Sequence, residues 1–371
     1  MIQKKSSPDY ILLFVTVALL CLGVVMVFSS SMVLSHAYYQ DSFYFLKKQA
    51  TWAGLGVVVL VVFSFFNYRN LRFLAFPGLI LSLSLLVLVL IPGVGEMAGG
   101  ARRWLAFGPV SFQPAEMTKV ALVLFLAVSL PQRRRRIRSF SDGLLPYFLL
   151  LALIFGLINK QPDLGTALII GGLFFLIIFV AGARKRHLIL VGLISLFLIY
   201  SLVKLGPHRY QYQRLMAFKN PTDDIQNTDY QSWQSLLALG SGGLEGVGLG
   251  KSKQKFRYLP QPYTDFIFAV IGEELGFLGA IAVITLFLIF AWRGFRIAFL
   301  SPNLFGSLLA LGITSQIVLQ ALVNFGVVAG VLPVTGISLP LISFGGSSLI
   351  FTLMGIGILL NISQYIRVKR V

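Results

Sequence analysis

Hydrophobic positions dominate the chain in long stretches that short polar segments separate. Stretches of membrane-spanning length recur from Ile11 to Ile366, and a helix needs roughly 20 apolar residues to cross a bilayer. The pattern predicts an all-α, polytopic membrane protein with ten transmembrane helices. The predicted spans are about 11–33, 50–66, 73–91, 114–130, 144–159, 164–181, 188–205, 266–292, 304–331 and 343–366.

Composition supports this pattern and leaves no room for a separate soluble domain. Of the 371 residues, 57% are hydrophobic and only 12% are charged, whereas soluble chains carry about 25% charged residues. The lone Cys21 excludes a disulfide framework and a cysteine-based metal site. We therefore expect a single membrane domain over 1–371, with one long polar loop at about 206–264 between the seventh and eighth spans.

The net charge of +18 would suggest nucleic acid in a soluble protein, but here the cations lie between spans. The termini and alternate loops carry 17 Lys and Arg, against 5 in the short loops of the other side. This asymmetry predicts that both termini are cytoplasmic and that the long loop is extracellular. The Arg-rich run from Pro131 to Arg138 then anchors the topology beside anionic lipids, and no nucleic-acid partner is expected.

Four ionisable residues fall inside predicted spans, where charge is costly and usually functional. They are Glu116, Lys119, Glu273 and Glu274. Glu116 and Lys119 are three residues apart just after Pro114, which suits the start of a helix, so they can pair on one face. Such a pair either joins spans or lines a polar cavity that opens to the outer side.

Two aspartates mark the predicted outer boundary of the membrane: Asp163 begins the sixth span and Asp265 begins the eighth. Capping a helix is the ordinary role of an aspartate in this position. Asp265 also follows a loop rich in Lys, Arg, Tyr and Gln, at the height of a lipid headgroup. A catalytic carboxylate is therefore the alternative interpretation of Asp265.

The long loop contains the run SGGLEGVGLGKSKQKFRYLP, in which Lys251 and Arg257 could bind a phosphate or pyrophosphate. A solvated basic loop that touches lipid headgroups is the alternative. The run is not a Walker motif, because Glu245 occupies the first glycine position and no strand precedes it. The uncharged, Pro- and Gly-containing segment 332–348 predicts a broken or re-entrant element beside a cavity.

Four segments together resemble the SEDS family (shape, elongation, division and sporulation), whose members include FtsW, RodA and SpoVE. They read GGARRWLAFGPVSFQPAEMTK, KQPDLGTALI, YLPQPYTDFIFAVIGEELGFLG and LPVTGISLPLISFGGSS. The resemblance covers nearly the whole chain in the order of the family's motifs. It is closer to FtsW and SpoVE than to RodA.

The resemblance implies a peptidoglycan glycosyltransferase that polymerises lipid II at the outer face of the bacterial cytoplasmic membrane, with septal wall synthesis in cell division as the expected process. Asp265 matches the family's essential loop aspartate, Glu116 and Lys119 match its membrane pair, and Asp163 matches its QPDLG aspartate. The expected substrate-binding residues are Arg102, Arg103, Lys251, Arg257, Glu116, Lys119, Asp163, Ser343, Gly345, Gly346 and Ser347.

An inverting transfer from a pyrophosphate donor needs one base to take the proton of the attacking hydroxyl. Asp265 is the candidate, and cations such as Arg102, Arg103, Lys251 and Arg257 could stabilise the leaving pyrophosphate. A divalent cation, Mg²⁺ or Mn²⁺, with Asp265 as a ligand instead of a base, stays open. No other cofactor is indicated.

The resemblance also implies partners and leaves two alternatives. The expected partners are a class B penicillin-binding protein, which is a transpeptidase, other division proteins and membrane lipids. Gly276 and Gly279, taken as lipid-facing, are small residues that would permit close helix contact. A lipid II flippase would use the charged residues inside the spans. A non-catalytic scaffold would not depend on the Asp265 carboxylate.

Overall fold

The structure, a computed structural model, describes residues 6–98, 101–108, 110–204, 214, 218, 230–256 and 258–366. The chain is mostly helical. Its helices are α1 (Tyr10–Tyr39), α2 (Tyr44–Phe65), the 3-10 helix η1 (Tyr68–Leu74), α3 (Ala75–Leu88), α4 (Pro114–Gln132), the 3-10 helix η2 (Arg136–Arg138), the π-helix η3 (Phe140–Leu144), α5 (Leu145–Asn159), α6 (Leu164–Val180), α7 (Lys185–Lys204), α9 (Tyr230–Ser241), α10 (Ile267–Leu300), α11 (Leu304–Val328) and α12 (Gly346–Ser363). Its strands are β1 (Gly95–Ala98), β2 (Ala101–Phe107) and β3 (Val110–Phe112).

The helices make this a multi-pass membrane protein. Among the described residues, eight helices are long and apolar enough to cross a bilayer, and the shorter α6 is apolar as well. They fall on the stretches predicted from the sequence. Two of them run well past the predicted ends, since α1 continues to Tyr39 and α10 to Leu300.

Short polar residues and prolines set where helices begin. The Asp9 carboxylate accepts a hydrogen bond from the Leu12 amide at 3.0 Å and caps α1. Asn303 caps α11 in the same way, through the Gly306 amide at 2.7 Å. Pro114 is the first residue of α4, as its position in the sequence predicts.

The prediction of a wholly helical chain misses a small antiparallel sheet with the order β1-β2-β3. Leu105 at its centre is paired with Gly95 on one side and Phe112 on the other, and it is buried. The segment lies between two predicted spans and is too short and Gly-rich to stand out as strands. Its consequence is positional, because β2 carries both Arg102 and Arg103.

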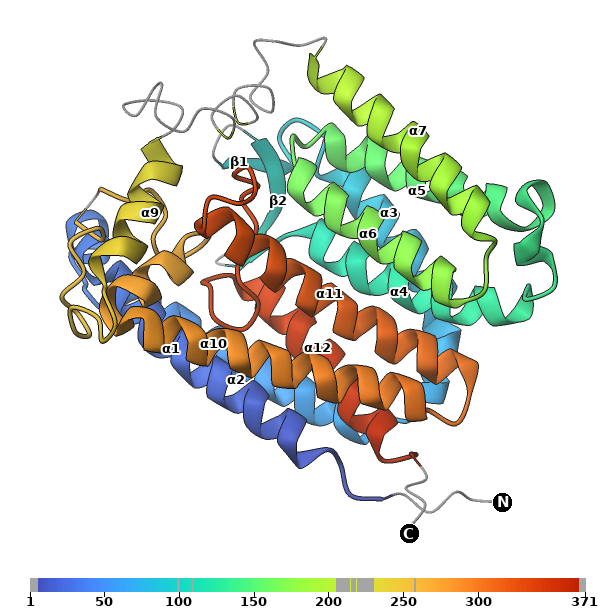
Figure 1. Ribbon diagram of the computed structural model, residues 1–371, viewed down its shortest axis with the longest axis horizontal. Helices are drawn as coiled ribbons and strands as arrows, with labels where there is room; N and C mark the ends of the chain where they lie inside the picture. The colour runs from blue at the N-terminus through green and yellow to red at the C-terminus, as the bar shows by residue number, and fades with distance from the viewer. Residues whose placement is uncertain are drawn as a thin grey trace.

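The helices pack into one bundle in which α2 lies along α12 and α10 lies along both α1 and α11. Figure 1 shows the two chain ends together at one end of this bundle, and the sheet and α9 away from them, towards the opposite end. Buried apolar side chains from α1, α4, α10, α11 and α12 form a continuous core.

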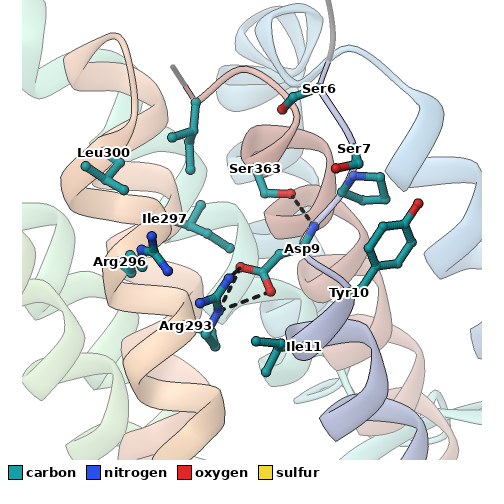
Figure 2. A pocket seen from close by; sticks show the side chains of 12 residues that line it. Ser6, Ser7, Asp9, Tyr10, Ile11, Arg293, Arg296, Ile297, Leu300 and Ser363 are labelled. Carbon is teal, nitrogen blue, oxygen red and sulfur yellow. Dashed lines mark hydrogen bonds and ion pairs between the residues drawn. The ribbon is translucent and has the colours of Figure 1, made fainter. Parts of the chain in front are cut away.

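An ion pair ties the two chain ends to α10 (Figure 2). Arg293 donates to both carboxylate oxygens of Asp9, with an Nη2–Oδ2 distance of 2.6 Å. The Asp9 amide donates to Ser363 Oγ at 3.1 Å, and Ser6 binds the Gln364 carbonyl. A cavity of about 330 Å³ lies beside this ion pair. The N-terminal segment is thus fixed to α10 and α12, far along the bundle from the sheet.

Candidate functional site

Asp265 lies in the turn before α10 and is held there through its neighbours' backbone atoms. Ser343 Oγ donates to the carbonyl of Thr264 at 2.6 Å, and Asn324 Nδ2 donates to the carbonyl of Asp265 at 2.7 Å. The helix begins two residues later, at Ile267, with Phe266 at the N-cap position. Asp265 therefore does not cap α10, and the capping interpretation is wrong for this residue.

The Asp265 carboxylate has an unusual environment. Within the described residues, hydrogen bonds reach its backbone carbonyl but not its carboxylate oxygens. Burial raises the pKa of the carboxyl from 3.8 to about 6, and this rise outweighs the opposing effect of Arg214 and Arg103. The negative charge of Asp163 adds to the rise. A carboxylate with a pKa near neutrality is suited to accept a proton at physiological pH.

Arg103 and Asp163 form the side of the site nearest the sheet. Arg103 Nε donates to the Gln161 carbonyl at 3.0 Å, and Nη2 donates to the carbonyl of Pro162. The Arg103 Nε and Asp163 Oδ2 atoms are 4.0 Å apart. Asp163 also caps α6, because it accepts hydrogen bonds from the amide and hydroxyl of Thr166 at 3.1 and 3.0 Å. The capping role predicted for Asp163 is therefore confirmed, and its role as a substrate-binding residue stays a prediction.

Glu116 and Lys119 form the predicted pair inside the bundle. Lys119 Nζ lies 2.8 Å from Glu116 Oε1 and also 2.8 Å from Gln320 Oε1 on α11. The exposed fractions are 5% for Glu116 and 2% for Lys119. The pair therefore joins α4 to α11, which is the first of the two interpretations made from the sequence, and neither side chain lies open to an outer cavity.

Residues 242–256, the glycine-rich loop, pack against an interruption of the helical backbone in α10. Gly276 has φ +66 inside this helix, so the carbonyls of Glu273 and Glu274 are released from the helical pattern. The Val247 and Gly248 amides donate to these carbonyls, both at 3.0 Å. Gly276 is buried against the loop and does not face lipid, contrary to the expectation for this residue.

The side chain of Glu273 is bound by the same loop. It accepts hydrogen bonds from the Lys253 amide at 2.8 Å and from the Ser252 hydroxyl. Lys251 lies between the last glycine of the loop and Ser252, and its side chain is exposed. Arg257 lies outside the described residues.

Glu274 is equally well bound. It accepts from Ser29 Oγ of α1 at 2.6 Å, from the Ser252 amide at 3.3 Å and from Lys255 Nζ at 3.3 Å. Glu274 and Lys255 are both fully buried. The two glutamates inside the eighth span are thus anchors for the glycine-rich loop and for α1.

Comparison with known proteins identifies the family to which the chain belongs. A family model described as "Cell cycle protein", covering FtsW, RodA and SpoVE, matches residues 10–368. The chain belongs to this FtsW/RodA/SpoVE family. It is 45% identical to "Stage V sporulation protein E" of Bacillus subtilis, over 99% of this chain and 100% of that protein. It is also 45% identical to the "Probable peptidoglycan glycosyltransferase FtsW" of Geobacter metallireducens, over 98% and 96%.

Solved structures agree with the family assignment. A chain from work on "Structural coordination of polymerization and crosslinking by a peptidoglycan synthase complex" superposes with a TM-score of 0.79 at 36% identity, covering 96% of this chain and 97% of that one. The Thermus thermophilus "Rod shape determining protein RodA" superposes with a TM-score of 0.71 at 35% identity, covering 96% of each chain. The resemblance to the SEDS family is therefore confirmed.

The FtsW/RodA/SpoVE chain also has the irregular segment predicted over 332–348. No helix or strand occurs between Val328 and Gly346, all of which lies in the described range. Ser343 accepts from the Leu339 amide at 2.8 Å while it holds Thr264, so it shapes the turn before Asp265.

The remaining residues of that motif lie against other elements. Ser347 Oγ accepts from the Gln113 amide at 3.3 Å. Gly345 is the N-cap of α12, and Gly346 packs so closely on Trp52 that a Cβ would lie 2.3 Å from the ring. Substrate binding by these three residues stays a prediction. The structure shows that they position the start of α12 against Gln113 and Trp52.

Sequence reasoning missed Arg214, the charged residue that most strongly opposes the pKa rise of Asp265. Its Nη1 donates to the Val334 carbonyl at 2.7 Å. Nearby Gly336 has φ +73, and a Cβ on it would lie 3.6 Å from Asp265 Oδ2. The basic and aromatic run 208–214 was the available indication in the sequence. Arg102, next to Arg103 on β2, is half-buried.

Among the described residues, no three His, Cys, Asp or Glu side chains come together as a ready-made metal site. Asp163 and Asp265 are the two carboxylates that share one charged cluster. Mg²⁺ is commonly held by one or two carboxylates together with substrate phosphates and water. The donor set here is thus of a kind that could bind a divalent cation together with a pyrophosphate.

Proposed function

We propose that this chain is a peptidoglycan glycosyltransferase that polymerises lipid II, the undecaprenyl-pyrophosphate-linked disaccharide pentapeptide, at the outer face of the bacterial cytoplasmic membrane. The observation that carries the proposal is Asp265, a partly buried carboxylate whose pKa is raised to about 6 against the opposing charges of Arg214 and Arg103. Family membership supplies the substrate class, because relatives at 45% identity bear the name peptidoglycan glycosyltransferase.

The topology that we propose has ten spans, with both termini in the cytoplasm. The eight long helices together with α6 and α7 make up the ten. The excess of Lys and Arg near the chain ends and alternate loops supports the cytoplasmic placement. Segment 206–264, which leads to Asp265, is then extracellular, where lipid II presents its sugars.

In the proposed reaction, the 4-hydroxyl of an acceptor GlcNAc attacks the anomeric carbon of the donor sugar. The new β-1,4 bond forms as the bond from that carbon to the pyrophosphate oxygen breaks. Asp265 takes the hydroxyl proton, and its raised pKa makes it a stronger base than an ordinary aspartate. Arg103 and Arg214 stabilise the charge that the leaving pyrophosphate gains. The lipid tail stays between helices in the membrane.

The role of Asp265 as a ligand for Mg²⁺ or Mn²⁺ is the variant of this proposal that stays open. Asp265 and Asp163 are the residues that would hold the cation, which would supply Lewis-acid stabilisation of the leaving group. Activity that disappears on chelation and returns with Mg²⁺ or Mn²⁺ would support the ligand role. Activity that is indifferent to chelation would leave Asp265 as the base.

The proposed partner is a class B penicillin-binding protein, the transpeptidase that would cross-link the new strand, with other division proteins and membrane lipids around it. The similarity to a chain from a peptidoglycan synthase complex supports a partner of this kind. Septal wall synthesis in cell division is the process that we propose, because the relatives at 45% identity described above bear the names FtsW and Stage V sporulation protein E.

A flippase is less well supported. Its polar path would need accessible charges inside the membrane, yet Glu116, Lys119, Glu273 and Glu274 are buried and hydrogen-bonded to the protein. The deciding experiment gives labelled lipid II to the purified chain in nanodiscs, with and without the transpeptidase. Glycan ladders on a gel are expected. Absence of polymer, together with leaflet exchange of lipid II in liposomes, would overturn the polymerase.

A further inference from the structure

Helix α11 carries a stripe of buried amide side chains that points towards the site. Gln316, Gln320 and Asn324 follow each other at four-residue spacing, which places them on one face of the helix. Their exposed fractions are 3%, 3% and 1%. Burying a polar side chain in a membrane span costs free energy unless the side chain makes hydrogen bonds.

Asn324 uses both hydrogens of its amide group on backbone carbonyls at the site. Nδ2 donates to the carbonyl of Asp265 at 2.7 Å and to that of Ile337 at 2.8 Å. One side chain thus fixes the turn that carries Asp265 and the irregular segment after α11 relative to each other. The two bonded residues, Asp265 and Ile337, are 72 residues apart in the sequence.

Gln320 repeats this arrangement one turn further from the site. Its Nε2 donates to the carbonyl of Ser338 at 3.1 Å, and its Oε1 accepts from Lys119 Nζ at 2.8 Å. Lys119 in turn is held by Glu116. The buried ion pair therefore fixes the orientation of the Gln320 amide, because only its Oε1 atom can accept a hydrogen bond from the lysine.

Residues 334–338 connect these amides to the site. Val334 accepts from Arg214, Gly336 lies against the Asp265 carboxylate, and the carbonyls of Ile337 and Ser338 are held by α11. We call residues 334–338 the positioning segment. Any displacement of this segment moves both the Arg214 guanidinium and the surroundings of Asp265.

We infer that Asn324 and Gln320 are positioning residues, which hold the positioning segment and Asp265 in the geometry that glycosyl transfer requires, and that the Glu116–Lys119 pair acts on the reaction through Gln320. The inference rests on the proposed function. It gives the membrane pair a role at a distance from the substrate, as the orienting end of a hydrogen-bonded chain from α4 through α11 to the site.

The test uses substitutions of matched shape in the full-length chain in nanodiscs. Asn324→Leu removes both donors to the site. Gln320→Glu removes the donor to Ser338 but keeps an acceptor for Lys119. Gln316→Met is the control, since Gln316 lies one turn away with the same burial, and its Oε1 has no hydrogen-bond partner in the described part of the chain.

Initial rates of lipid II polymerisation then separate positioning from mere support of the fold. Because misplacement of about 1 Å can cost about 100-fold, we expect kcat to fall about 100-fold in Asn324→Leu and about 10-fold in Gln320→Glu. The KM of each variant should stay within about threefold of wild type, because neither residue is placed against the substrate. The control should keep kcat within about threefold.

The pH profile supplies a readout that a structural role alone would not move. A loosened positioning segment changes both the hydration of Asp265 and the position of Arg214, so the acid limb of kcat/KM should move away from its wild-type position in Asn324→Leu but not in Gln316→Met. The charged groups facing Asp265, which are Arg103, Arg214 and Asp163, are the same in both variants.

The outcomes of this experiment are distinct. If wild type polymerises lipid II, and folded Asn324→Leu and Gln320→Glu both match the control, the inference is overturned while the proposed function stands. If wild type makes no polymer, the proposed function itself fails. If Asn324→Leu does not accumulate as folded protein, the comparison of Gln320→Glu with Gln316→Met decides.

Discussion

Asp265 and the Glu273–Glu274 pair lie only eight residues apart on either side of the start of α10, yet their surroundings differ completely. The two glutamates accept hydrogen bonds from backbone amides, serine hydroxyls and the buried Lys255. Within the described residues, the Asp265 carboxylate receives none of this support. Instead it has a raised pKa and two arginines nearby.

The difference teaches how to tell an anchor from a reactive group in a membrane protein. All three carboxylates fall where charge is costly, so location alone marks each of them as functional. A carboxylate that is buried and accepts hydrogen bonds from the protein on both oxygens, like Glu273 and Glu274, is not accessible to a substrate. A partly buried carboxylate with a raised pKa, which accepts no hydrogen bond from the described residues, stays available to a substrate, and perturbed pKa values of this kind cluster at functional sites.

The largest expected effect is that of Asp265→Asn, which preserves shape and removes the base. General-base catalysis contributes about 10² to 10⁴-fold in rate, so polymerisation of lipid II should fall by that factor. The melting temperature should not fall, because no hydrogen bond to the carboxylate is lost among the described residues. Activity within about tenfold of wild type would show that Asp265 is no different from the two glutamates.

Glu274→Gln should behave in the opposite way. The substitution leaves Lys255 as an uncompensated buried cation, and breaking a buried pair in this way costs about 3–5 kcal/mol of unfolding free energy. A scan of thermal unfolding in nanodiscs should show the loss, while the rate for each folded molecule stays near that of wild type. The double variant Glu274→Gln with Lys255→Met should recover part of the stability. A Glu274→Gln protein that is folded but inactive would contradict the distinction between Glu274 as an anchor and Asp265 as the reactive carboxylate.

Substituting the charged neighbours of Asp265 should shift its titration in opposite directions. Arg103→Gln removes a cation that lowers the pKa of Asp265, so the acid limb of kcat/KM should move to higher pH. Asp163→Asn removes a negative charge that raises this pKa, so the limb should move to lower pH. Asparagine still caps a helix, which keeps α6 intact. Shifts of the same sign in both variants would refute the assigned electrostatics.

The smallest effect belongs to the ion pair at the chain ends. Asp9→Asn weakens the contact with Arg293, whose side chain is 14% exposed, and retains the helix cap. We expect a loss of about 1–3 kcal/mol in stability, between the values for exposed and fully buried ion pairs, and no change in kcat. Thermal unfolding and the polymerisation rate measured on the same preparation provide the check. A reduced kcat would mean that this end of the bundle is coupled to the site.

Much of the fold follows from the sequence, because spans and their ends have local causes. The apolar stretches locate the helices, Pro114 marks the first residue of α4, and the i,i+3 spacing brings Glu116 and Lys119 together. The choice of Asp265 and Asp163 as site residues needed the family motifs as well, since a helix cap was the ordinary explanation of each from the residues alone.

What the sequence did not predict depends on contacts between distant segments. Arg214 is held near Asp265 by its hydrogen bond to the Val334 carbonyl. The hydrophobic pattern of the sequence does not predict this contact between two distant segments. The roles of Glu273 and Glu274 could not be inferred, because their partners come from the loop and from α1. The sheet was not predicted because its strands are short and lie in the polar segment between α3 and α4.

The most direct test of Asp265 as the base is the pH dependence of kcat/KM for lipid II polymerisation by the wild-type chain. A base works when deprotonated, so the rate should rise with pH through an apparent pKa of about 6. Glu273→Gln should retain the same limb, because that carboxylate is bound by the loop. A profile that is flat across this range, or a limb that disappears in Glu273→Gln, would contradict the assignment of Asp265 as the catalytic base.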